Sequence, residues 1–170
     1  MRQMPRRPPP RRSDYRVVWH DDCNISDMSM NTEKELQTLL SGEVAAAETY
    51  TQAIDALPIQ HQHLLRGLRE RHGDAIKYFH DELQKRGVEP QASSGAWGHF
   101  AKAVERSALM VSHKLALKAL RAGEERGLAE YLSAARSANL AGEHRTHIET
   151  KLVPAQHHHV SKLDKVLQEV

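Results

Sequence analysis

The chain of 170 residues is long enough for one domain that buries most of its apolar surface, so a second core is not needed. Two Phe and two Trp among plentiful Ala, Leu, Glu and Arg favour an all-α fold, and a single cysteine, Cys23, excludes an internal disulfide. The net charge is +2, no apolar run reaches the roughly 18 residues of a membrane span, and residues 1–30 lack the apolar stretch of a secretory signal. We expect a cytoplasmic protein without a membrane partner.

The first segment in chain order is basic and rich in proline. Five arginines and no acid lie in residues 1–12, which leaves the rest of the chain at −3. Such an arm can bind the phosphates of nucleic acid, but the same composition is typical of a disordered leader, and we favour that interpretation. We therefore expect residues 1–30 to be a disordered extension, with nucleic acid as a partner only through this arm. Met1, Met28 and Met30 are the candidate translation starts.

Residues 31–170 are expected to form one domain, which begins with two helices. The first starts near Asn31 with Thr32 as its cap, and Pro58 closes it. The second covers about 59–86, before Gly87. Apolar residues recur at spacings of three and four along both helices, which is the pattern of a bundle seam. The predicted inward residues are Leu36, Leu40, Glu43, Ala47, Tyr50, Ile54 and Leu57, then Leu65, Leu68, His72, Ala75 and Phe79.

A long connection separates this pair from two further helices. It covers about 87–112 and contains a short amphipathic segment, 97–110, that we expect to be an extra helix across the bundle. The third helix covers about 113–138, and the fourth follows a link around 139–142, with a kink expected at Pro154. Their predicted inward residues are Leu117, Leu120, Glu124, Gly127, Tyr131, Ala134 and Ala138, then Ile148, Leu152, Ala155, His159, Leu163 and Val166.

Connections that are short, long and short predict an antiparallel four-helix bundle of ferritin-like topology, in which a crossover joins two hairpins. The hairpins also resemble an internal repeat. Ser41-Gly42-Glu43 and Ala122-Gly123-Glu124 each precede a tyrosine that lies seven residues after the glutamate.

Each predicted seam carries one polar residue, and the four lie at similar depths. Glu43 lies 15 residues before Pro58 and His72 lies 14 after it, while Glu124 and His159 are about equally far from the second hairpin loop. Because a helix rises about 1.5 Å per residue, Glu43, His72, Glu124 and His159 are expected to share one buried layer.

Three interpretations of this layer remain open at the level of sequence. The residues can satisfy one another as buried hydrogen-bonded pairs, with Tyr50 and Tyr131 completing the set. They can bind one divalent Fe, Mn or Zn ion. A dinuclear carboxylate centre is disfavoured, because it uses Glu-x-x-His on two helices and the positions three before the histidines are Arg69 and Gln156. Glu48, Glu125 and Glu130 are expected to be solvated helix charges.

Several strings resemble a bacterial branch of the ferritin-like superfamily whose members are described as four-helix-bundle proteins of unknown function. They are Ser41-Gly42-Glu43 with Glu48-Thr49-Tyr50, Gly87-x-x-Pro90 leading to Ser93-Ser94-Gly95-Ala96-Trp97-Gly98, and Leu120-x-x-Gly123-Glu124 with Tyr131. The resemblance covers about residues 31–168. It implies the bundle fold and places any inherited metal site at Glu43, His72, Glu124 and His159.

The sequence leaves two classes of function. The first is a non-enzymatic or weakly metal-binding, stress-associated helical bundle that forms a homo-oligomer. The alternative is a redox or storage protein that uses Fe, Mn or Zn at the Glu/His layer. No Gly-rich phosphate loop, nucleophile elbow or Cys-based metal motif is present.

Overall fold

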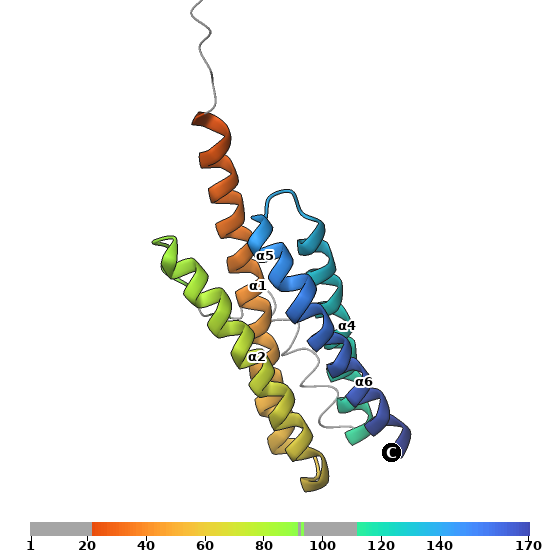
Figure 1. Cartoon of the computed structure of the whole chain (residues 1–170). Coiled ribbons are helices and arrows are strands. Elements are labelled where there is room, and N and C mark those ends of the chain that lie inside the picture. The colour runs from red at the N-terminus through yellow and green to blue at the C-terminus, as the bar shows by residue number, and fades with distance from the viewer. Residues whose placement is uncertain (1–21, 92, 94–111) are drawn as a thin grey trace, which may run out of the picture.

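The computed structural model describes residues 22–91, 93 and 112–170, and within them the chain is all-helical, with no strand. Four long helical rods account for the fold (Figure 1). Their elements are α1 (Asp22–Ala56), α2 (Ile59–Lys85), α4 (His113–Arg136), α5 (Gly142–His147), the π-helical turn η1 (Ile148–Leu152) and α6 (Val153–Glu169). No helix in these ranges is long and apolar enough to cross a membrane.

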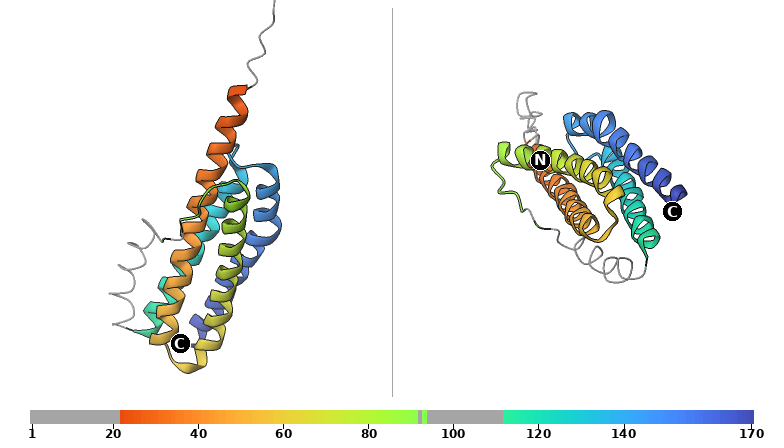
Figure 2. Two further views of the ribbon diagram at one scale, coloured as in Figure 1. Left: turned by 90° about the vertical axis from the view of Figure 1, so that its left-hand side faces the viewer. Right: turned by 90° about the horizontal axis from the view of Figure 1, so that it is seen from below.

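The rods are arranged as two pairs. α1 and α2 lie side by side in opposite directions and are joined by a tight loop, and α4 runs beside the continuous α5–η1–α6 rod (Figures 1 and 2). α1 packs mainly on α2 and α4 mainly on α6, whereas α1 meets α4 along a looser seam. The predicted extra helix over 97–110 lies outside the described residues.

Helix α1 begins earlier than predicted. It starts at Asp22 rather than Asn31, so residues 22–30 of the expected disordered extension are helical. Thr32, the predicted cap, lies within the helix and is almost fully buried, and its hydroxyl donates to the carbonyl of Asn139 at 2.6 Å. The hydroxyl therefore joins α1 to the loop after α4 instead of ending a helix. Residues 1–21 lie outside the described part of the chain.

The helix ends follow the expected chemistry more closely. α1 ends at Ala56, just before Pro58, and α2 ends at Lys85. Gly87 then adopts φ +73°, a conformation that favours glycine, and the N–H of Val88 bonds to the carbonyl of Leu83 at 3.1 Å. α4 starts with the Ser112 side chain accepting from the N–H of Leu115.

The second pair of helices departs from the prediction at Ala138 and at Ala155. α4 ends at Arg136, so Ala138 lies beyond the helix and is exposed rather than inward. The fourth rod continues through Pro154. A π turn precedes this proline, and in it the N–H of Val153 bonds to the carbonyl of Ile148, five residues back. Pro154 therefore lies in the first turn of α6, where a proline is tolerated. The predicted inward Ala155 is only half-buried, and Gln156 is buried in its place.

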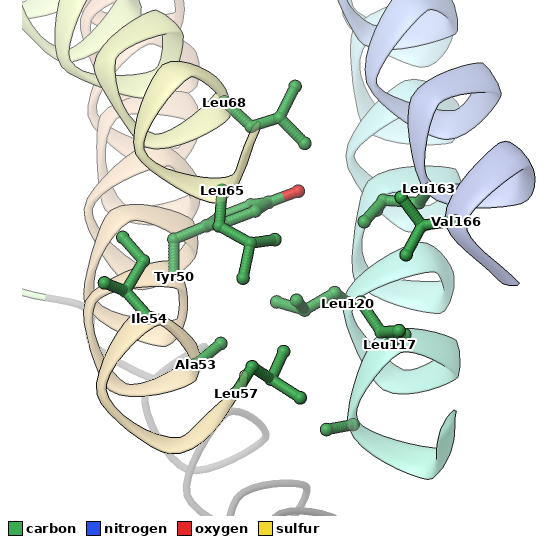
Figure 3. Close-up of a cluster of buried hydrophobic side chains, with 11 residues drawn as sticks. Tyr50, Ala53, Ile54, Leu57, Leu65, Leu68, Leu117, Leu120, Leu163 and Val166 are labelled. Atoms are coloured by element: carbon green, nitrogen blue, oxygen red, sulfur yellow. The ribbon is translucent and has the colours of Figure 1, made fainter. Parts of the chain in front are cut away.

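Two apolar clusters form the core, one on each side of the polar layer. The cluster near the α1–α2 loop draws on all four rods (Figure 3). Its buried members are Tyr50, Ala53, Ile54, Leu57, Leu65, Leu68, Ala116, Leu117, Leu120, Leu163 and Val166. The buried members of the other are Leu36, Leu39, Leu40, Ala75, Phe79, Leu83, Tyr131, Ala134, Leu140 and Ile148. Together they hold the layer at mid-height and limit its access to water.

Candidate metal centre

The structure brings the four predicted polar residues into one buried layer. Glu43, His72, Glu124 and His159 come from four different rods, and each is at most 7% exposed. Adjacent members are joined directly, at 2.8 Å between His72 and Glu43, 3.1 Å between His72 and Glu124, and 3.2 Å between His159 and Glu124. The equal depths predicted from the distances to the hairpin loops are confirmed.

His72 bridges the two carboxylates. Its Nδ1 lies against Glu43 Oε2 and its Nε2 against Glu124 Oε1. Because a carboxylate only accepts hydrogen bonds, the ring donates from both nitrogens when it is an imidazolium. Burial opposes the charge, but Glu43 and Glu124 outweigh it and raise the pKa of His72 from 6.5 to about 10. At neutral pH His72 is therefore a buried cation between Glu43 and Glu124.

Glu124 has the larger number of partners. Tyr50 and His72 contact its Oε1, while Gln156 and His159 contact its Oε2. Burial alone would raise the pKa of this carboxyl, but the bonds with His159 and His72 prevail and lower it from 4.5 to about 2. Glu124 is therefore ionised at neutral pH.

Glu43 has one histidine and one tyrosine partner. Tyr131 donates to its Oε1 at 2.6 Å, and His72 holds its Oε2. Burial and the neighbouring carboxylates raise the pKa of both Tyr50 and Tyr131 well above 10, so both phenols remain donors. Each carboxylate oxygen of the two glutamates thus has at least one protein donor.

Gln156 is the member of the layer whose role the sequence did not reveal. Its amide donates to the main-chain carbonyl of Glu124 at 3.0 Å as well as to the carboxylate. The side chain of Gln156 reaches Glu124 by passing close to Gly127 of α4. A Cβ at residue 127 would lie 2.9 Å from the Gln156 amide nitrogen, so this contact depends on the glycine. The sequence contains two hints of this contact. Gln156 stands three residues before His159, and Gly127 interrupts the row of larger side chains along the α4 seam.

His159 carries the one unsatisfied atom of the layer. Its Nδ1 faces Glu124, and its Nε2 is buried without a hydrogen-bond partner among the described residues. A neutral ring with its proton on Nδ1 donates to Glu124 and keeps a lone pair on Nε2. The next residues out, His157 and His158, are exposed as predicted.

Comparison with protein-family models, with curated proteins and with solved structures finds no match to this chain. What the layer can do therefore follows from its own chemistry.

Three of the four layer residues are spaced to hold a metal ion. His72, Glu124 and His159 each offer a ligand atom, and these atoms lie within 4.8 Å of one another. Two imidazole nitrogens and one carboxylate form a donor set for Fe²⁺, Mn²⁺ or Zn²⁺ that leaves coordination positions free. Glu43 is not part of this group. Its oxygens hold His72 Nδ1 and the hydroxyl of Tyr131.

A second group lies near the end of α2 and consists of Glu82, Glu143 and His144. Its ligand atoms also lie within 4.8 Å of one another. Here Arg86 Nη2 donates to His144 Nε2 at 3.0 Å and lies 3.5 Å from Glu143. The Arg86 guanidinium therefore already supplies, between Glu143 and the buried His144, the positive charge that a cation would bring.

Proposed function

We propose that this chain is a helical bundle of ferritin-like topology that binds one divalent transition metal ion at His72, Glu124 and His159, and that folds without it. The observation that carries the proposal is the grouping of His72, Glu124 and His159, whose ligand atoms lie within 4.8 Å of one another in a buried layer. Two imidazoles and one carboxylate that converge in a buried polar layer form a ready donor set for such an ion.

Glu43 has a supporting part in this proposal. A carboxylate that accepts from the Nδ1–H of a ligating histidine fixes the ring orientation and leaves Nε2 for the metal. Glu43 stands in that relation to His72, at 2.8 Å from Nδ1. Binding then requires His72 to release the proton on Nε2, so affinity is expected to fall as the pH falls.

The ferritin-like topology is supported by the order of the rods. Two hairpins with a long connection between them match the connectivity of that class. A ferritin-type dinuclear centre fits less well, because the amide of Gln156 donates to Glu124 where such a centre has a bridging carboxylate. A bound ion would supply a Lewis acid with free coordination positions, and a redox or storage role is the alternative use of the same residues.

A different observation favours a second candidate, in which the layer is purely structural. Both carboxylates and His72 are hydrogen-bonded by protein groups alone, so the layer is nearly complete without an ion. Buried polar residues of this kind can hold helices in register.

Thermal melts of protein purified without an affinity tag separate the two candidates. After chelation, adding Fe²⁺, Mn²⁺ or Zn²⁺ should stabilise the wild type by about 2.7 kcal/mol at one hundred times the dissociation constant. His159→Ala should abolish the gain. The matched control is the double variant His157→Ala with His158→Ala, which removes two exposed imidazoles next to the site and should keep it. A wild type that melts identically with and without every metal would leave the structural candidate.

A further inference from the structure

A cavity adjoins the layer on the side where α1 meets α4. Its volume is about 90 Å³, enough for several water molecules. Glu43, His72 and Glu124 form its inner wall, and all three are buried. Thr38, which is exposed, and Glu130, which is half-buried, also line it. The cavity therefore extends from the surface of the bundle to the candidate metal ligands.

Small residues keep this passage open. Gly42, Ala45 and Ala46 of α1 and Ala119, Gly123 and Gly127 of α4 line it. A Cβ built on Gly123 would meet no atom within 4 Å, so the space beside this residue is free. α1 and α4 face each other across the cavity through these short side chains.

Carboxylates outnumber basic groups along the cavity. Glu130 lies toward the surface, and Glu43 and Glu124 lie at the layer. Among the described residues that line the cavity, none is a lysine or an arginine, and His72 is the sole basic group. A low-dielectric cleft lined by carboxylates concentrates cations and repels anions.

We propose that this cavity is the route by which a divalent cation reaches the layer, and that Glu130 draws the ion into it. Glu130 was expected to be an ordinary solvated helix charge, and its place in the cavity wall assigns it this further role. The inference rests on the proposed function, because an entry route presupposes a site at its end.

Co²⁺ is the probe for the test, because its visible absorption reports on its ligands. Mixed rapidly with the metal-free full-length chain, it should develop absorption bands in the wild type. Gly123→Leu should narrow the cavity and slow the appearance of the bands at least tenfold, while the final amplitude stays the same. Gly67→Leu is the matched control, since Gly67 is also a helical glycine with no atom within 4 Å of a built Cβ, and it lies outside the cavity.

Charge removal tests the role of Glu130. Glu130→Gln should slow Co²⁺ uptake about threefold at low ionic strength, and the difference should shrink in high salt, because exposed charges are screened. Glu48→Gln removes the same charge from an exposed position of α1 outside the cavity and should leave the rate unchanged.

The outcomes distinguish the inference from the function it rests on. A wild type that develops no Co²⁺ bands at equilibrium would overturn the metal site itself. Bands that appear in Gly123→Leu at the wild-type rate would overturn the entry route and leave the site standing. If Gly123→Leu does not fold, Ala46→Leu narrows the same cavity from α1 and decides the question in the same way.

Discussion

The hydroxyl of Tyr131 donates to Glu43 Oε1 at 2.6 Å, although the two residues are 88 positions apart. The hydroxyl of Tyr50 makes the reciprocal bond to Glu124. Each tyrosine lies seven residues after the glutamate of its own helix but binds the glutamate of the other helix. α1 and α4 are therefore joined twice in the layer, where their small residues leave the packing loose.

Removing one of these hydroxyls should weaken the contact between the two pairs of helices. Tyr131→Phe keeps the ring, which stacks on Phe79 at a centroid distance of 6.3 Å, but leaves Glu43 Oε1 without its donor. We expect a loss of about 1 to 3 kcal/mol in the free energy of unfolding, measured in urea. In the double variant with Glu43→Gln the loss should be smaller than the sum of the single losses. Strict additivity would show that the two groups do not interact.

Glu43 should tolerate an amide better than an apolar side chain. Glu43→Gln retains an oxygen that accepts from His72 and keeps the shape of the side chain, so it should cost less than Glu43→Leu. Glu43→Leu leaves Tyr131 and His72 without a partner and should cost about 1 to 3 kcal/mol. Urea titration at pH 7 measures both, and a Gln variant as unstable as the Leu variant would mean that the charge, rather than the hydrogen bonds, is what the layer requires.

Stability of the metal-free protein should decline in alkali. The pKa of His72 is raised from 6.5 to about 10 in the folded state, so its contribution to stability is full below pH 6.5 and is lost as the pH rises through 10. Melting temperatures between pH 6 and 10.5 should show this decline. In His72→Gln the part of the decline that His72 causes should be absent. An equally steep decline in that variant would assign the alkaline transition to other groups.

In acid, the stability of the protein should fall as the pH decreases. Glu124 has its pKa lowered from 4.5 to about 2, so its contribution is present above pH 4.5 and is lost as the pH falls toward 2. Glu124→Gln should therefore be less stable than the wild type at pH 7 and approach it near pH 2. Melts at both pH values measure the gap, and a constant gap would contradict the lowered pKa.

Two glycines of α4 should respond in opposite ways to the same substitution. Gly127→Ala places a methyl group 2.9 Å from the Gln156 amide and should destabilise the protein, because Gln156 must leave Glu124. Gly123→Ala, four residues earlier, meets no atom and should stabilise the helix by up to about 1 kcal/mol. Urea titration measures the free energy of unfolding of both variants, and each serves as the control for the other. A stabilised Gly127→Ala would show that Gln156 can move away from Glu124 without loss of stability.

The sequence alone was sufficient to place Glu43, His72, Glu124 and His159 in one layer. Apolar spacings of three and four define the inner face of each helix, and the constant rise per residue converts distance from a hairpin loop into depth. Neither quantity depends on how the helices cross. The helix ends at Pro58 and Gly87 were also predictable, because they depend only on the local backbone chemistry of proline and glycine.

The tertiary structure alone decided which atoms meet within the layer. Periodicity places Tyr131 on the inner face of α4, but its bond to Glu43 depends on the separation of α1 and α4 and on side-chain rotamers, which packing determines. The π turn before Pro154 brings Gln156 inward, and Gly127 gives it room. The same placement makes Glu43 the partner that holds His72 rather than a member of the candidate metal group. A pattern along one helix carries no information about these contacts, because they are made between helices.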